Sequence, residues 1–143
     1  SGANTYTGDT TISGGALALG ASNRLADTSP VVVETGATFN LAGFSETVGS
    51  LTGGGAVTLG AGTLTVGGTD ASTTFGGVIS GSGRLTKLGT GTLTLSGAQT
   101  YAGNTTISAG TLVAGSTLAS GAIAIDSGAT LIYDRATGDW NQN

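Results

Sequence analysis

The chain contains no cysteine, methionine or histidine, and these absences exclude several kinds of chemistry at once. Without cysteine, neither a disulfide framework nor a thiolate metal ligand can form. Without histidine, both a Cys/His zinc site and a Ser–His catalytic triad are excluded. A function that depends on one of these centres is therefore ruled out by residue content alone.

Charge is also scarce. Charged residues make up 8% of the chain, against about 25% in an ordinary domain. The net charge of −4 argues against a nucleic-acid partner, whose phosphates require a basic face. The longest apolar runs fall well short of the roughly 18 residues of a membrane helix, so we expect no membrane insertion by this segment. No signal peptide is visible, and an exported protein would contain this chain as an internal fragment.

Glycine and β-branched residues are what the chain has in abundance. Glycine occupies 28 of the 143 positions, proline only one, and hydrophobic residues make up 38%. That hydrophobic share, with so little charge, excludes a disordered chain, and glycine shows no three-residue period of the collagen type. No 3.6-residue periodicity appears, so helices are not expected. The composition predicts an all-β protein with many tight turns.

Short strand–turn–strand units recur along the chain around six glycines, spaced 18 to 29 residues apart. Three residues before each glycine stands an aliphatic residue, and we predict that these six form one buried column. The leucines that follow four of the turns are predicted to line the next wall. The glycines are Gly15, Gly36, Gly62, Gly91, Gly110 and Gly128; the column is Ile12, Val33, Leu59, Leu88, Ile107 and Ile125; the leucines are Leu17, Leu64, Leu93 and Leu112.

A third strand per unit is weaker but visible at 46–51 and 75–80, with poorer candidates at 23–25 and 117–118. In the remaining gap, Tyr101 is predicted to point inward. Three short strands in each unit of about 20 residues, with like residues recurring unit after unit, are typical of a β-solenoid. A β-sandwich also uses short strands but does not require the same aliphatic position in every unit. The sequence therefore predicts a parallel β-solenoid of about six rungs.

The sequence also contains a repeat that is longer than one rung. Residues 1–20 match residues 96–115 at 13 of 20 positions, with an offset of 95. We interpret 1–143 as a single β-helix segment, an internal part of a longer protein. Its repeat segments are 1–20 and 81–115, its spacer is 21–80, and the start of the next unit is 116–143.

The run 81–115, GSGRLTKLGTGTLTLSGAQTYAGNTTISAGTLVAG, resembles the passenger-associated strand repeat of bacterial autotransporters, the type V secreted proteins. The resemblance implies a right-handed parallel β-helix passenger, secreted or displayed at the cell surface and anchored in the outer membrane in the full-length protein, often as an adhesin. The family has no common catalytic residue in the repeat, so none is transferred. Matching positions are Gly81, Gly83, Leu85, Lys87, Gly89, Gly91, Leu93, Leu95, Gly97, Tyr101, Gly103, Thr105, Ile107, Gly110 and Leu112.

Few residues suggest chemistry of their own. Lys87 is the one lysine available to a Ser–Lys pair, and we predict it to be a solvated strand residue. Acidic residues are predicted to be solvated at turns or on outward strand positions. Glu34 and Asp126 both stand two residues before a turn glycine, but their rungs are far apart along the stack. The sequence Gly67-Gly68-Thr69-Asp70 comes closest to a calcium-binding tract but lacks the required pattern. Gly53–Gly55 and the pair Gly81 and Gly83 resemble phosphate loops only by glycine content and are predicted to be rung corners. Trp140 is predicted to pack over the end of the stack.

We therefore predict no catalytic, cofactor-binding or metal-binding residue. The expected function is that of a structural rod supporting adhesion or self-association, such as cell–cell aggregation or biofilm formation. Its expected partners are neighbouring rungs of the parent passenger, further copies of itself, or host and bacterial surface molecules. One alternative is a carbohydrate- or ice-binding solenoid, in which Thr63/Thr65 and Thr92/Thr94 would stack on adjacent rungs. A less favoured alternative is a polysaccharide-cleaving β-helix enzyme with paired carboxylates.

Overall fold

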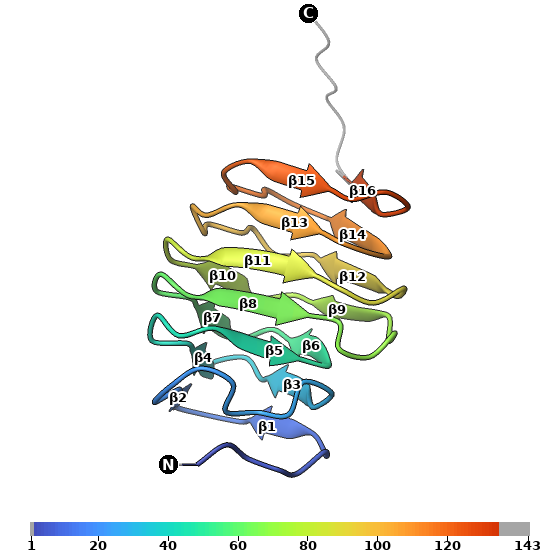
Figure 1. Cartoon of the computed structure of the whole chain (residues 1–143). Helices are drawn as coiled ribbons and strands as arrows, with labels where there is room; N and C mark the ends of the chain where they lie inside the picture. The colour runs from blue at the N-terminus through green and yellow to red at the C-terminus, as the bar shows by residue number, and fades with distance from the viewer. Residues whose placement is uncertain (1, 135–143) are drawn as a thin grey trace, which may run out of the picture.

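The computed structural model describes residues 2–134, and every regular element in this range is a β-strand. The strands stack in parallel into three walls of a coil that rises from the N-terminus to the C-terminus (Figure 1). Wall A contains β1 (Thr10–Ile12), β3 (Pro30–Val33), β6 (Ser50–Gly53), β9 (Thr73–Phe75), β12 (Thr92–Leu95), β14 (Thr111–Ala114) and β16 (Thr130–Tyr133). Wall B contains β2 (Ala16–Ala18), β4 (Thr38–Asn40), β7 (Ala56–Thr58) and β10 (Val78–Ser80). Wall C contains β5 (Glu46–Val48), β8 (Thr63–Val66), β11 (Arg84–Lys87), β13 (Thr105–Ile107) and β15 (Ile123–Ile125).

Each turn of the coil visits walls A, B and C in order. Hydrogen-bonded partners in wall A follow one another after 19 to 22 residues, which is the length of one turn. In the two uppermost turns, wall B is reduced to a bridge between Gln99 and Leu118. The predicted β-solenoid of about six turns is confirmed.

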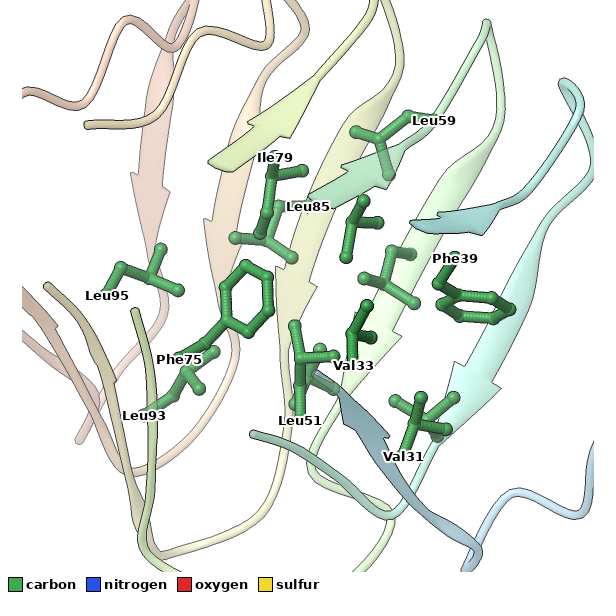
Figure 2. Close-up of a cluster of buried hydrophobic side chains, with 14 of the residues drawn as sticks. Val31, Val33, Phe39, Leu51, Leu59, Phe75, Ile79, Leu85, Leu93 and Leu95 are labelled. Atoms are coloured by element: carbon green, nitrogen blue, oxygen red, sulfur yellow. The ribbon is translucent and has the colours of Figure 1, made fainter. Parts of the chain in front are cut away.

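The core is a column of aliphatic and aromatic side chains enclosed by the three walls. Figure 2 shows Phe39, Phe75 and Ile79 among the leucines and valines that converge there from different walls. These side chains are completely buried. Because strand side chains alternate between faces, every second residue of each short strand points inward. Burial of each such side chain contributes about 1.5–3 kcal/mol to stability.

The predicted single column of six aliphatic residues is wrong. Ile12 pairs with Val33 in wall A, whereas Ile107 pairs with Ile125 in wall C. Leu59 is buried after β7, at the corner between walls B and C. Two of the six side chains are not buried: Leu88 is 36% exposed and Ile125 is 49% exposed. The predicted second wall fails in the same way, because Leu93 and Leu112 pair in wall A while Leu64 lies in wall C and Leu17 in wall B.

The physical reason is that all three corners of the coil are built from glycine. The six turn glycines of the predicted units lie at three different corners of the coil. Residues at equal distance from these glycines therefore belong to strands of different walls. A corner packs closely on the corner below it: a Cβ on Gly77 would lie 1.7 Å from the carbonyl oxygen of Gly55, and one on Gly83 would lie 2.0 Å from that of Gly62. Glycine is required at these positions because only a residue without a side chain permits the approach.

The weaker predicted strands are resolved into separate elements. The stretch 46–51 is divided by a corner at Gly49 into β5 and the start of β6, and 75–80 is divided at residues 76–77 between β9 and β10. Residues 23–25 form no strand, and Leu118 makes only the bridge to Gln99. Tyr101 points inward as predicted and is completely buried. The predicted packing of Trp140 lies outside the described residues.

Candidate interaction surfaces

Wall C carries a row of threonines on its outer face. Thr47, Thr65, Thr86 and Thr106 are direct partners on four consecutive turns. Because neighbouring strands lie about 4.8 Å apart, their side chains form a regular ladder parallel to the axis of the coil. The row ends at Ala124, the partner of Thr106 in the next strand.

Wall A presents two rows side by side. Thr92 is followed on the next turns by Thr111 and Thr130, and Thr94 by Val113 and Ile132. The expected stacking of Thr63/Thr65 on Thr92/Thr94 is wrong, because β8 belongs to wall C and β12 to wall A. The threonines instead form rows that were not visible from the sequence spacing.

Charge is confined almost entirely to the corners and to wall C. The strands of walls A and B contain no charged residue, and those of wall C contain Glu46, Arg84 and Lys87. Asp70 and Asp126 lie at the corner between walls C and A, as do residues 9 and 27 lower in the stack. The outer faces of walls A and B are therefore flat, uncharged surfaces rich in Thr, Ala and Val.

Lys87 is buried, which corrects the expectation that it is solvated. It lies two residues after the buried Leu85 in β11, so the same strand alternation places both side chains inside. The ammonium group donates hydrogen bonds to the carbonyl oxygens of Leu88 and Gly89. Burial lowers the pKa of Lys87, and the nearby Asp70 carboxylate opposes this shift. The lysine thus satisfies the backbone of the corner between walls C and A.

Asp70 bonds to the same corner from the turn below. Its Oδ1 accepts a hydrogen bond from the backbone N–H of Thr90 at 2.8 Å. This N–H is the main reason that the pKa of Asp70 lies below its usual value. The acid that came closest to a calcium tract in the sequence is therefore already used as a link between successive turns.

Glu46 is an exception to the prediction that the acids are solvated, because only 1% of its surface is exposed. Its carboxylate accepts hydrogen bonds from the backbone N–H groups of Arg24 at 2.7 Å and Leu25 at 3.2 Å. Desolvation raises the pKa of Glu46 despite these two bonds. Residues 23–25 form no strand for β5 to pair with, and the carboxylate supplies the acceptors that a strand would have provided.

A chain of hydroxyl groups joins each copy of the repeat to a serine of the next turn of the coil. In the second copy the Tyr101 hydroxyl lies 2.6 Å from Thr105 Oγ1, which donates to Ser120 Oγ at 2.7 Å. Ser120 Oγ in turn donates to the Gly103 carbonyl oxygen at 3.2 Å. In the first copy the corresponding atoms of Tyr6, Thr10, Ser29 and Gly8 are joined in the same order, at 2.7, 3.4 and 2.7 Å.

The two tyrosines differ in their surroundings. Tyr101 is covered by the turn below it, and burial raises its pKa to about 12. Tyr6 is 43% exposed because it lies in the lowest turn of the described chain. The sequence could have indicated this network, since the tyrosine and threonine occur at equal spacing in both copies and share the inward face.

The remaining candidates do not form a common site. Glu34 follows β3 and Asp126 follows β15, so they are separated by most of the stack. Within residues 2–134 we find no group of three or more acidic residues placed to hold a metal ion. Asp139 lies outside the described residues.

The surface of the described residues is hollowed at the corner between walls A and B and at the N-terminal end of the core. A shallow groove of about 330 Å³ runs along the corner between walls A and B, and a second hollow of about 230 Å³ lies at the N-terminal end of the core. No helix of the described chain could cross a membrane. The groove is lined by Gly36, Ala37, Thr38, Gly54, Gly55, Ala56, Gly76, Gly77 and Val78, and the hollow by Gly2, Asn4, Tyr6, Leu17, Ala18, Leu19, Gly20, Arg24 and Leu25.

Comparison with known proteins agrees with this architecture. The passenger-associated-transport-repeat family matches residues 1–19 and 85–114. The chain is also 46% identical over 118 residues to the adhesin BmaC autotransporter of Brucella suis biovar 1 (strain 1330). That match covers 72% of this chain but only 3% of the Brucella protein, so the chain spans a small part of its relative. No solved structure matches the chain.

These matches, together with the stacked parallel strands, identify the chain as an autotransporter passenger repeat region. Such a passenger is secreted or displayed at the bacterial cell surface, where the full-length protein is anchored in the outer membrane. The resemblance inferred from residues 81–115 is confirmed.

Proposed function

We propose that this segment is a non-enzymatic rod that carries adhesive or self-associating surface away from the bacterial cell. The observation that carries the proposal is the unbroken core: buried apolar side chains extend from Ile12 to Leu118 through consecutive turns. A solenoid whose every turn packs on its neighbours transmits its shape along its length. The adhesin identity of the Brucella relative supports the same role.

The rod would act through many weak contacts. Walls A and B offer uncharged strands to a neighbouring surface, and wall C offers its row of threonines. A single hydroxyl contact is weak because water competes for it, but contacts repeated along a rigid face add as avidity. Rigidity therefore matters more to this function than any one side chain.

Beads coated densely with the chain test this proposal. We expect the beads to aggregate or to be retained on bacterial or host cells, whereas albumin-coated beads remain dispersed. Thr94→Arg on wall A and Thr86→Arg on wall C place a charge on one outer face each, and their circular dichroism spectra should stay unchanged. Loss of adhesion with one variant would identify its wall. A folded chain that neither aggregates beads nor attaches them to cells would refute the adhesive role.

The threonine rows also support a second candidate, an ice- or carbohydrate-binding surface. Wall A places Thr92, Thr111 and Thr130 beside Thr94 and two β-branched residues, a two-column array on three turns. A thermal hysteresis assay on the purified chain tests ice binding, and Thr111→Lys should abolish any activity that depends on this array. An unchanged freezing point in the parent chain would reject the ice-binding candidate.

A further inference from the structure

The two copies of the repeat lie on different walls of the coil. The strand Thr-Thr-Ile is β1 in the first copy and β13 in the second, yet β1 belongs to wall A and β13 to wall C. The next strand shows the same displacement, since β2 belongs to wall B and its counterpart β14 to wall A. In the cyclic order A, B, C in which the chain visits the walls, both strands of the second copy therefore lie one wall before their counterparts in the first copy.

The cause is that the 95-residue offset between the copies is not a whole number of turns of the coil. From β1, four complete turns lead to β12 in the same wall, and two further walls lead to β13. The offset of 95 residues between the copies thus corresponds to four and two-thirds turns. The four turns from Thr10 in β1 to Leu93 in β12 take 83 residues, so the remaining 12 of the 95 lead only two walls further and the second copy starts on a different wall.

The rotation leaves the internal structure of the repeat intact. The tyrosine–threonine hydroxyl pair of the repeat is present in both copies, and in each it is joined through a serine of the next turn, Ser29 or Ser120, to a glycine carbonyl of the repeat. The tyrosine segment of the first copy packs beneath wall C, where Asn4 N donates to Arg24 O. In the second copy it packs on wall B, where Thr100 N donates to Ile79 O. The repeat therefore keeps its own contacts while it exchanges one set of neighbouring strands for another.

We infer that equivalent outer surfaces of successive repeats point to different sides of the rod. The outward Thr11 of the first copy faces away from wall A, and its counterpart Thr106 faces away from wall C. In a passenger with such repeats in tandem, three repeats would make fourteen turns and return the surface to its first wall. The rod would then hold bulky partners on several sides at once. This geometry goes beyond the proposed adhesive role and does not depend on which molecule is bound.

The cysteine-free chain makes a direct test possible. Thr11→Cys and Thr106→Cys are combined, both thiols are biotinylated through a short linker, and monovalent streptavidin is added in excess. The copies are separated along the axis by about four to five strand spacings, roughly 20–24 Å. Two streptavidin molecules cannot fit side by side over that distance on one wall, but they can bind to different walls. We expect a complex containing two streptavidins by mass photometry.

The matched control combines Thr11→Cys with Thr94→Cys. These residues lie on wall A, separated by four turns, so the axial distance is similar but the direction is the same. We expect this chain to bind one streptavidin, with the second binding at least tenfold more weakly. Mass spectrometry confirms double labelling of both variants before the measurement. Equal occupancy of the two variants, whether one or two streptavidins, would overturn the inferred rotation.

Discussion

The hydroxyl oxygen of Tyr101 lies 2.6 Å from Oγ1 of Thr105 inside the fifth turn, with both side chains completely buried. Burial raises the pKa of this tyrosine from 10.0 to about 12. The folded state therefore retains a proton that the unfolded state releases between about pH 10 and 12, so stability is lost as the pH rises through this window. A shift of this size corresponds to about 3 kcal/mol.

Tyr101→Phe should remove this alkaline loss. At neutral pH the variant is expected to be less stable by about 0.5–1.5 kcal/mol, since one buried hydrogen bond is deleted. Urea unfolding at pH 8 and pH 11 measures both effects, and Tyr6→Phe is the matched control from the exposed copy. If Tyr101→Phe loses as much unfolding free energy between pH 8 and pH 11 as the parent and Tyr6→Phe do, the alkaline loss does not come from Tyr101.

Leu93→Ala should destabilise the chain by about 2–5 kcal/mol, because it opens a cavity in the middle of the core. Leu93 is only 1% exposed and pairs with the equally buried Leu112 on the next turn. The adjacent Thr94→Ala on the outer face should change stability by less than about 0.5 kcal/mol. Denaturant unfolding compares the two variants, and similar losses would show that the strand does not alternate as described.

Lys87→Met should destabilise the chain by about 1–3 kcal/mol. Methionine retains most of the aliphatic stem but leaves the carbonyl oxygens of Leu88 and Gly89 without their donor. Arg84→Met, on the exposed end of the same strand, serves as the control and should have little effect. Thermal melts distinguish the two, and a melting temperature of Lys87→Met equal to or above that of the parent would disprove a stabilising role for the corner bonds.

Glu46→Gln should change the pH dependence of stability. The pKa of Glu46 is raised by burial, so the folded state binds a proton more tightly than the unfolded state does. Its contribution is greatest below about pH 4.5 and declines as the pH rises through the raised pKa. Urea unfolding at pH 4 and pH 7 should show a smaller decline in the variant than in the parent, with the exposed Glu34→Gln as control. The same decline in Glu46→Gln and the parent would exclude Glu46 as its source.

The N-terminal end of the coil should mediate association at high concentration. Tyr6 is 43% exposed there, the apolar hollow of about 230 Å³ is open, and β1 and β2 have no strand below them in the described chain. Unpaired edges next to apolar side chains promote strand pairing, and a lysine placed on such an edge blocks it. Sedimentation velocity over a hundredfold concentration range should show oligomers that Ala18→Lys weakens. A monomer at every concentration would show that this end is not adhesive.

Much of the local structure could be predicted because it depends on neighbouring residues. Strand alternation places Leu93 inside, and by the same rule it places Lys87 inside beside Leu85, although its charge suggested a solvated position. The glycine corners were likewise recognisable, because a closely packed turn excludes any side chain. Glu46 was missed, because its acceptor role arises only from the absence of a strand at residues 23–25.

By itself, the sequence determined that the chain forms an all-β solenoid, which residues recur, and for many strands which side faces the core, although at the end of β11 Lys87 and not the predicted Leu88 is buried. Only the tertiary structure decided the wall to which each strand belongs. Thr-Thr-Ile at 10–12 and at 105–107 is one sequence on two different walls. The wall on which a strand lies depends on the summed length of all preceding turns. Because these turns vary between 19 and 22 residues, their sum cannot be read from the sequence around any one strand.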